Sequence, residues 1–189
     1  MIDLILNYLN NSSAVTITVL VLLSFYLILT FWIFIYRFMA LSSLVDSEKR
    51  ALEALVSRET ITISPLSSLS KCTSKTTNHS SEILSACEIS LIREASSGVS
   101  WLSIISSTSP FVGLFGTVVG ILESFAKFSS HSKVGFSIIA PAISEALVAT
   151  AAGIFVAIFA YTFHQLIVRK IYEFDTFLKA QSKILVSRG

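Results

Sequence analysis

Charge is the property that this sequence has least of. Only 14% of its residues are Asp, Glu, Lys or Arg and 53% are hydrophobic, whereas about 25% are charged in a typical soluble domain. Leu4–Tyr36 and Ala95–Leu122 contain no formal charge, and Val134–Val168 contains only Glu145. Each stretch exceeds the ~20 residues that cross a hydrocarbon core. The chain is therefore not a soluble globular protein, and the sequence predicts an all-α membrane protein with three transmembrane helices.

Cysteine is also scarce, and the pattern around it does not predict a metal site. The two cysteines are Cys72 and Cys87, with His79 between them. This spacing matches no structural zinc pattern and supplies at most three ligands. Both cysteines fall in a segment that we place in the reducing cytoplasm, so we expect no disulfide. The sequence predicts no metal and no cofactor.

Motifs for enzymatic chemistry and for nucleic-acid binding are missing as well. There is no phosphate-binding Gly loop ending in Lys-Ser/Thr, and no Ser/His/acid set in an ordered soluble domain. The net charge is only +2, and the basic residues are interspersed with acidic ones rather than forming a stripe. We therefore predict that the protein is not an enzyme and that its surroundings are the lipid bilayer, not nucleic acid.

Lys and Arg are distributed unevenly around the three spans. None precedes the first span, seven lie from Arg37 to the second span, two separate the second and third spans, and five follow the third. The positive-inside rule then predicts a periplasmic N-terminus and a cytoplasmic C-terminus. The predicted segments are the periplasmic N-terminus (1–14), the first span (15–38), a cytoplasmic helical loop (39–100), the second span (101–126), a periplasmic connector (127–135), the third span (136–165) and a cytoplasmic C-terminal helix (166–189).

The cytoplasmic loop reads as a helical hairpin. Charged and apolar residues mix in Ser42–Val56, which predicts a helix leaving the first span. Thr60–Ser81 is rich in Ser and Thr and predicts a loop. We expect helix to resume near Glu82 and to run into the second span, where Pro110 should kink it or mark a change in packing.

Small residues line one face of each of the last two spans. Gly113, Gly116, Thr117 and Gly120 share a face at offsets of 3, 4 and 7. In the third span, Glu145 shares a face with small residues that include Ala149 and Ala152. Such faces let helices approach closely, and Gly116-x-x-x-Gly120 is a helix dimerisation pattern. Gly113, Gly116, Gly120, Ala149 and Ala152 are thus the predicted helix-packing residues.

Glu145 is the candidate functional residue, because a carboxylate in mid-bilayer costs roughly 2.5–3.5 kcal/mol on insertion scales. One hypothesis is a carboxyl that takes up a proton from one side and releases it to the other. The alternative is a protonated Glu145 that only packs, in a structural membrane anchor. Thr117 and Thr150 either bond to their own helix or line the path, and Thr150 lies roughly 140° around the helix from Glu145.

Two long motifs carry a family resemblance. Residues 109–120 read SPFVGLFGTVVG and residues 140–151 read APAISEALVATA. They resemble the second-span and third-span signatures of the MotA/TolQ/ExbB proton-channel family, with the closer likeness to TolQ and ExbB. The chain departs from the pattern at Val119, where many relatives carry Trp, and at Ile158–Ala160, which lack a common proline.

The resemblance implies a bacterial inner-membrane subunit that forms a homo-oligomer, a pentamer, around a dimer of an ExbD- or TolR-like single-span protein. Positions matching Thr117, Glu145 and Thr150 would line the proton path. Proton flow would then act through a TonB- or TolA-like protein on the outer membrane. TonB-linked transport and Tol-Pal envelope maintenance both fit this resemblance.

Overall fold

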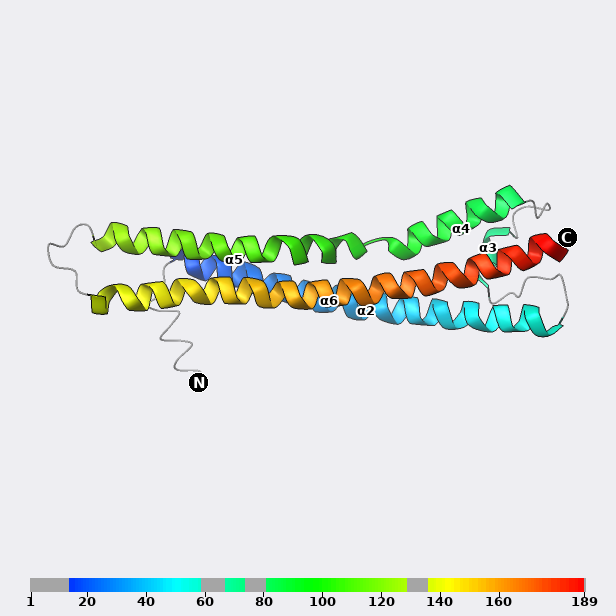
Figure 1. Ribbon diagram of the computed structural model, residues 1–189, viewed down its shortest axis with the longest axis horizontal. Coiled ribbons are helices and arrows are strands. Elements are labelled where there is room, and N and C mark those ends of the chain that lie inside the picture. The colour runs from blue at the N-terminus through cyan, green and yellow to red at the C-terminus, as the bar shows by residue number, and fades with distance from the viewer. Residues whose placement is uncertain (1–13, 59–66, 74–80, 129–135, 189) are drawn as a thin grey trace. The chain divides into compact units, whose positions relative to one another are not determined.

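The computed structural model describes residues 14–58, 67–73, 81–128 and 136–188 of the chain. Every regular element in this described part is a helix (Figure 1). The helices are α2 (Ala14–Arg58), α3 (Ser68–Thr73), α4 (Ser81–Ser96), α5 (Val99–Phe128) and α6 (Phe136–Arg188).

Three of these helices are long and apolar enough to cross a membrane. The candidate spans are Ala14–Ser57 in α2, Val99–Ala126 in α5 and Ile143–Ser187 in α6. The prediction of an all-α protein with three candidate spans is confirmed. At 45 and 53 residues, α2 and α6 are far longer than the ~20 residues that a bilayer needs. The helical continuations expected after the first and third spans are therefore present.

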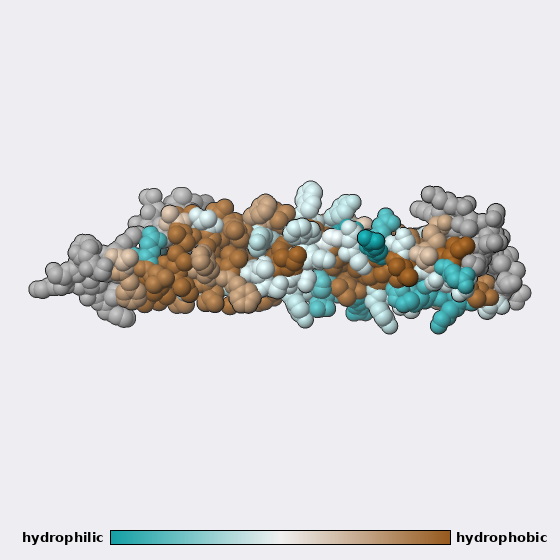
Figure 2. Space-filling view, turned by 90° about the horizontal axis from the view of Figure 1, so that it is seen from above, coloured by the Kyte–Doolittle hydropathy of each residue, from teal (hydrophilic) through white to brown (hydrophobic). Residues whose placement is uncertain are grey.

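The chain divides into two compact units, and α2 and α6 contribute residues to both. Unit 1 contains the described residues within 1–32 and 101–163, and unit 2 contains those within 33–100 and 164–189. In Figure 2 the described part of unit 1 shows mainly hydrophobic, brown surface. Unit 2 shows many white and teal residues. This difference matches the scarcity of charge in the three predicted spans.

The core of unit 1 is built from branched and small side chains. Spacings of three and four residues place them on one face of each helix, so each helix turns one stripe toward the other two. The buried cluster comprises Val19 and Leu23 from α2, Ile105 from α5, and Ala149, Val156 and Ala160 from α6.

The core of unit 2 uses larger side chains with a similar spacing. On α2 the buried stripe contains Leu41, Val45 and Leu55, and on α6 it contains Ile167, Phe174, Leu178 and Leu185. Leu84 of α4 joins Leu55 and Leu185 in one cluster. Burying a Leu or Phe side chain contributes about 1.5–3 kcal/mol, so hydrophobic burial stabilises this unit.

Part of the segment predicted as a loop is helical. The short helix α3, Ser68–Thr73, lies inside residues 60–81, so the loop prediction is wrong there. Pro65 and His79 lie outside the described residues. Helix α3 begins where a distant residue satisfies its first amide: Ser68 N donates to the Glu48 carboxylate at 2.6 Å. Leu69 N donates to Ser67 Oγ at 3.2 Å. The start of α3 thus depends on α2, which local composition does not reveal.

The helix expected to run from Glu82 into the second span is interrupted. It starts as predicted, at Ser81, but α4 ends at Ser96 and α5 starts at Val99. Gly98 lies between them with a φ of 78°, a conformation that favours glycine and ends helices. By contrast, α5 continues as helix through Pro110.

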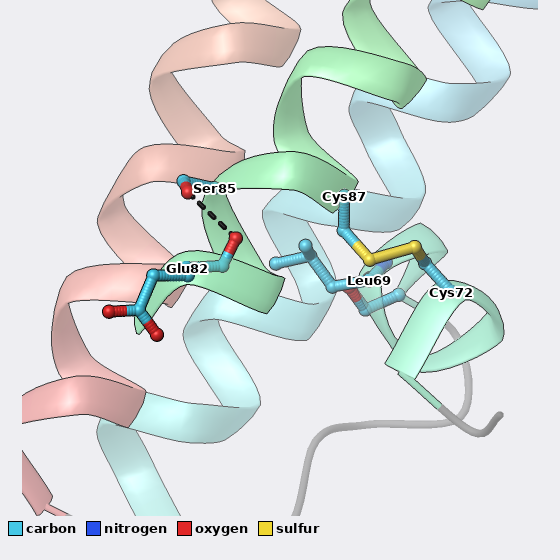
Figure 3. The surroundings of a disulfide bond; sticks show 6 residues. Leu69, Cys72, Glu82, Ser85 and Cys87 are labelled. Carbon is cyan, nitrogen blue, oxygen red and sulfur yellow. Dashed lines mark hydrogen bonds between the residues drawn. A yellow bond between two sulfur atoms is a disulfide. The ribbon is translucent and has the colours of Figure 1, made fainter. Parts of the chain in front are cut away.

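The expectation of no disulfide is wrong, because Cys72 of α3 is bonded to Cys87 of α4 (Figure 3). The expectation rested on the compartment alone. The packing of α3 against α4 brings the two Cα atoms to 6.0 Å, within the range that a disulfide spans. Tertiary structure therefore pairs two cysteines that the sequence leaves apart.

Candidate functional site on helices α5 and α6

Two glycines let the backbones of α5 and α6 touch within unit 1. A Cβ atom added at Gly113 would lie 2.6 Å from Ala149 O, and one added at Gly153 would lie 2.6 Å from Ser109 O. Real Cβ atoms do not come this close to backbone, so neither position accepts a side chain unless the helices move apart. The crossing thus fixes the α5–α6 spacing at the site.

The other two glycines of α5 face neighbours with more room. A Cβ at Gly116 would lie 2.9 Å from Val19 Cγ1 of α2 and 3.1 Å from Ala149 Cβ of α6. At Gly120 the nearest atoms would be Thr16 Oγ1 at 3.3 Å and Ala146 Cβ at 3.5 Å. The glycine face of α5 is therefore in contact with both α2 and α6.

The hydroxyls of Thr117 and Thr150 meet between α5 and α6. Their Oγ1 atoms are 2.5 Å apart. Thr117 Oγ1 also lies 2.8 Å from Ala146 O of the other helix, but 3.4 Å from Gly113 O of its own helix. Thr117 therefore bonds mainly across the helix interface rather than along its own helix.

Each threonine hydroxyl has one proton, so the pair can be ordered in two ways. In one order Thr150 donates to Thr117, and Thr117 donates to Ala146 O at 2.8 Å. In the other, Thr117 donates to Thr150, and Thr150 donates to Gly113 O at 3.3 Å. The bond from Thr117 to Ala146 O is shorter than the bond from Thr150 to Gly113 O, and this favours the first order. The two hydroxyls form a short hydrogen-bonded chain that can run in either direction.

Glu145 lies on the flank of the α6 stripe that packs against α5. It is half-buried and directly precedes the buried Ala146, whose carbonyl accepts the Thr117 bond. Thr150, 140° away on an ideal helix, is turned to α5 by its bonds. The side chains of Glu145 and Thr150 therefore leave α6 in different directions, although they lie only five residues apart. Ala152 packs partly buried against the unit 1 core.

Two residues of this site did not stand out in the sequence. Gly153 follows Ala149 by four residues and so continues the small-residue face, which was the available signal. Ser109 is fully buried beside it, and among the described residues its hydroxyl has no hydrogen-bond partner. Its carbonyl makes the closest approach to Gly153.

The face of α5 opposite its glycines is exposed and strongly apolar. Phe111 is 71% exposed and Leu122 is 63% exposed in this single chain. Such a face requires lipid or another helix to cover it. The exposed large residues of this face are Phe111, Leu114, Phe115, Val118 and Leu122.

Comparison with known proteins identifies related chains. The family described as the MotA/TolQ/ExbB proton channel family matches residues 48–179. An ExbB-like 1 biopolymer transport protein of Helicobacter pylori is 39% identical over 188 residues, covering 100% of both chains. ExbB of Pseudomonas putida is 42% identical over 51% of this chain and 30% of its own. TolQ of Pseudomonas aeruginosa is 50% identical over 31% of this chain and 25% of its own.

Proposed function

Because the chain belongs to the MotA/TolQ/ExbB proton channel family, we propose that it is a proton-channel subunit of the bacterial inner membrane. It uses the proton-motive force to energise a partner that spans the envelope, in a TonB-linked or a Tol-Pal system. The relatives include both ExbB and TolQ proteins, so the choice between these systems belongs to the partners.

The observation that carries the proposal is the polar site inside the apolar unit 1. Glu145 is the only formal charge of the third span. Thr117 donates a hydrogen bond to the carbonyl of Ala146, the residue that follows Glu145. A titratable group next to a hydroxyl chain that runs in either direction suits proton transfer, because each hydroxyl both accepts and donates. We assign the proton path to Glu145, Thr117 and Thr150.

The apolar outer face of α5 supports assembly. Several copies around one axis would cover this face and bring several Glu145 carboxyls together. We propose a homo-oligomer, a pentamer, around an ExbD- or TolR-like single-span protein, with a TonB- or TolA-like protein as the next partner. The Lys and Arg distribution favours a periplasmic N-terminus and a cytoplasmic C-terminus.

The test measures proton uptake by proteoliposomes that contain the chain and its single-span partner. A potassium diffusion potential supplies the driving force, and a pH-sensitive dye inside the vesicles reports protons. Glu145→Gln keeps the size and polarity of the side chain but removes its titration. We expect uptake to fall to the level of empty vesicles, at wild-type amounts of inserted protein.

Glu123→Gln is the matched control, since it makes the same change on the neighbouring span and should leave uptake near the wild-type rate. If Glu145→Gln conducts protons at the wild-type rate, the hypothesis that Glu145 takes up and releases protons is wrong. Glu145 would then be a packing residue of a structural membrane anchor. The anchor alternative also predicts that Gly116→Leu abolishes assembly while Glu145→Gln is tolerated.

A further inference from the structure

The disulfide of unit 2 lies in a segment that the Lys and Arg distribution assigns to the cytoplasm. Cys72 of α3 is joined to Cys87 of α4, 15 residues on. Thiols in the cytoplasm are normally kept reduced. We propose that Cys72 and Cys87 form a reversible redox site, oxidised by a peroxide or a small disulfide and reduced by a dithiol. The proposal rests on the cytoplasmic placement of unit 2 given above.

The two cysteines differ in their exposure. Cys87 is only 5% exposed. Cys72 is half-buried and lines a cavity of about 500 Å³, together with Arg37, Leu44 and Glu94 among others. A small thiol can enter this cavity and reach Cys72, whereas Cys87 is covered by protein. Attack on the disulfide is therefore directed to Cys72, with Cys87 as the leaving thiolate.

Each step balances with these reagents. In reduction, a thiolate of the dithiol bonds to Cys72 Sγ, and the Cys72–Cys87 bond breaks with its electron pair on Cys87, which takes up a proton. The second thiolate of the dithiol then displaces Cys72, leaving the reductant as a disulfide. In oxidation, the Cys72 thiolate attacks one oxygen of hydrogen peroxide and the O–O bond breaks, which gives a sulfenic acid and hydroxide. The Cys87 thiolate then attacks Cys72 Sγ, and the S–O bond breaks with loss of hydroxide, which is protonated to water.

Helix α3 is anchored at both ends, and the disulfide is the anchor near its C-terminal end. At the start of the helix, Ser67 Oγ and Ser68 N donate to the Glu48 carboxylate at 2.9 Å and 2.6 Å. Toward its end, Cys72 holds it to α4, and Figure 3 shows Leu69 beside this bond. Reduction removes the second anchor and leaves the first. For a ring of about 15 residues, the loop-closure model predicts about a hundredfold increase in the opening equilibrium of α3.

The first experiment counts thiols on the full-length chain in intact cells. Cells are quenched with acid, and free thiols are alkylated with a maleimide that adds mass. During ordinary growth we expect two alkylated thiols per chain, and after a brief hydrogen peroxide pulse none, with both returning within an hour. A chain that stays oxidised throughout growth, or one that still carries two thiols after the pulse, overturns the proposal.

The second experiment tests the direction of attack with single-cysteine chains in membranes. Cys87→Ser leaves Cys72, and Cys72→Ser leaves Cys87. We expect glutathione disulfide to modify Cys72 at least tenfold faster than Cys87. Equal rates contradict the assigned access, and Cys→Ala versions repeat the measurement if a serine variant does not accumulate in the membrane.

The redox proposal and the proton-channel proposal can be tested independently of each other. Glu145→Gln should show the same thiol counts as the wild-type chain, whether or not it conducts protons. A disulfide that persists in growing cells would instead show that the cytoplasmic placement of unit 2 is wrong. Hydrogen exchange of residues 68–73 provides the conformational readout, which we expect to be faster in the reduced chain.

Discussion

The two units use the same long helices, α2 and α6, but the contacts that stabilise each unit internally are different. In unit 1 the backbones of α5 and α6 come into contact at Gly113 and Gly153. In unit 2 large side chains such as Phe174 and Leu178 are fully buried. Within lipid, apolar side chains gain nothing by leaving the solvent, so small residues and close packing drive helix association. In water, burial of large apolar side chains does so.

The two units also differ in the kind of polar group that they bury. Unit 1 uses hydroxyls, which bond to backbone carbonyls across α5 and α6. Unit 2 buries a carboxylate: Glu48 accepts bonds from Ser67, Ser68 and Gln181. These three donors satisfy the carboxylate and tie α2 and α6 to the start of α3. One unit thus has a small polar site in an apolar packing, and the other has a polar network in its core.

The largest expected effect is on the backbone contact of unit 1. Gly113→Ala places a methyl group 2.6 Å from Ala149 O, and backbone cannot move aside as a side chain can. We expect a loss of about 3 kcal/mol in stability, since overpacking costs typically 1–3 kcal/mol and occasionally more. Thermal unfolding of the chain in lipid nanodiscs measures this loss.

Gly120→Ala is the matched control on the same helix face. The added methyl would have Thr16 Oγ1 at 3.3 Å and Ala146 Cβ at 3.5 Å, which small shifts relieve. We expect a change under about 1 kcal/mol. If the two variants melt together, the α5–α6 contact at Gly113 is not the constraint that distinguishes unit 1.

The next effect tests the polar core of unit 2. Glu48→Ala removes the acceptor of the Ser68 amide, whereas Ser67 Oγ and Gln181 Nε2 keep second acceptors in Gln181 Oε1 and the Glu48 carbonyl. An unsatisfied buried group costs about 1–3 kcal/mol. We expect a loss of about 2 kcal/mol and faster proteolysis around α3. Glu53→Ala, on the exposed side of the same helix, should melt like the wild-type chain. A Glu48→Ala chain that resists protease as the wild type does would show that the network does not hold α3.

The smallest effect concerns the hydroxyl pair of unit 1. Hydrogen bonds between membrane helices contribute about 0.6 kcal/mol on average and about 1.7 at most. We expect Thr117→Val and Thr150→Val each to cost about 1 kcal/mol. Because both remove the same Oγ1–Oγ1 bond, the double variant should cost less than the sum. Strict additivity in a double-mutant cycle would contradict a direct bond between them.

Much of the fold followed from the distribution of charge. Three long stretches with at most one formal charge each predicted the three candidate spans, and the residues of 42–56 predicted the continuation of α2. Small residues at helical spacing drew attention to the glycine face of α5. Gly98 was missed as a helix end because a single Gly in a helical pattern is usually tolerated, and the positive φ appears only in the structure.

The partners across helices could not be predicted from local patterns. Helix α3 lies in a Ser-rich stretch that favours loop, and it forms where Glu48, 20 residues away, accepts its first amide. The same docking places Cys72 against Cys87. Likewise, composition alone left open whether Thr117 and Thr150 bond to their own helices, and the close α5–α6 crossing brings them together.

By itself the sequence determined that this chain crosses a membrane with three helices and keeps one carboxylate, Glu145, in an apolar span. Those properties depend on hydropathy and helical period, which are local. Only the tertiary structure decided which helix face meets which, and therefore that Thr117 bonds beside Glu145 and that the two cysteines pair. These contacts join residues far apart in the chain, and their distances are set by how closely the backbones can approach.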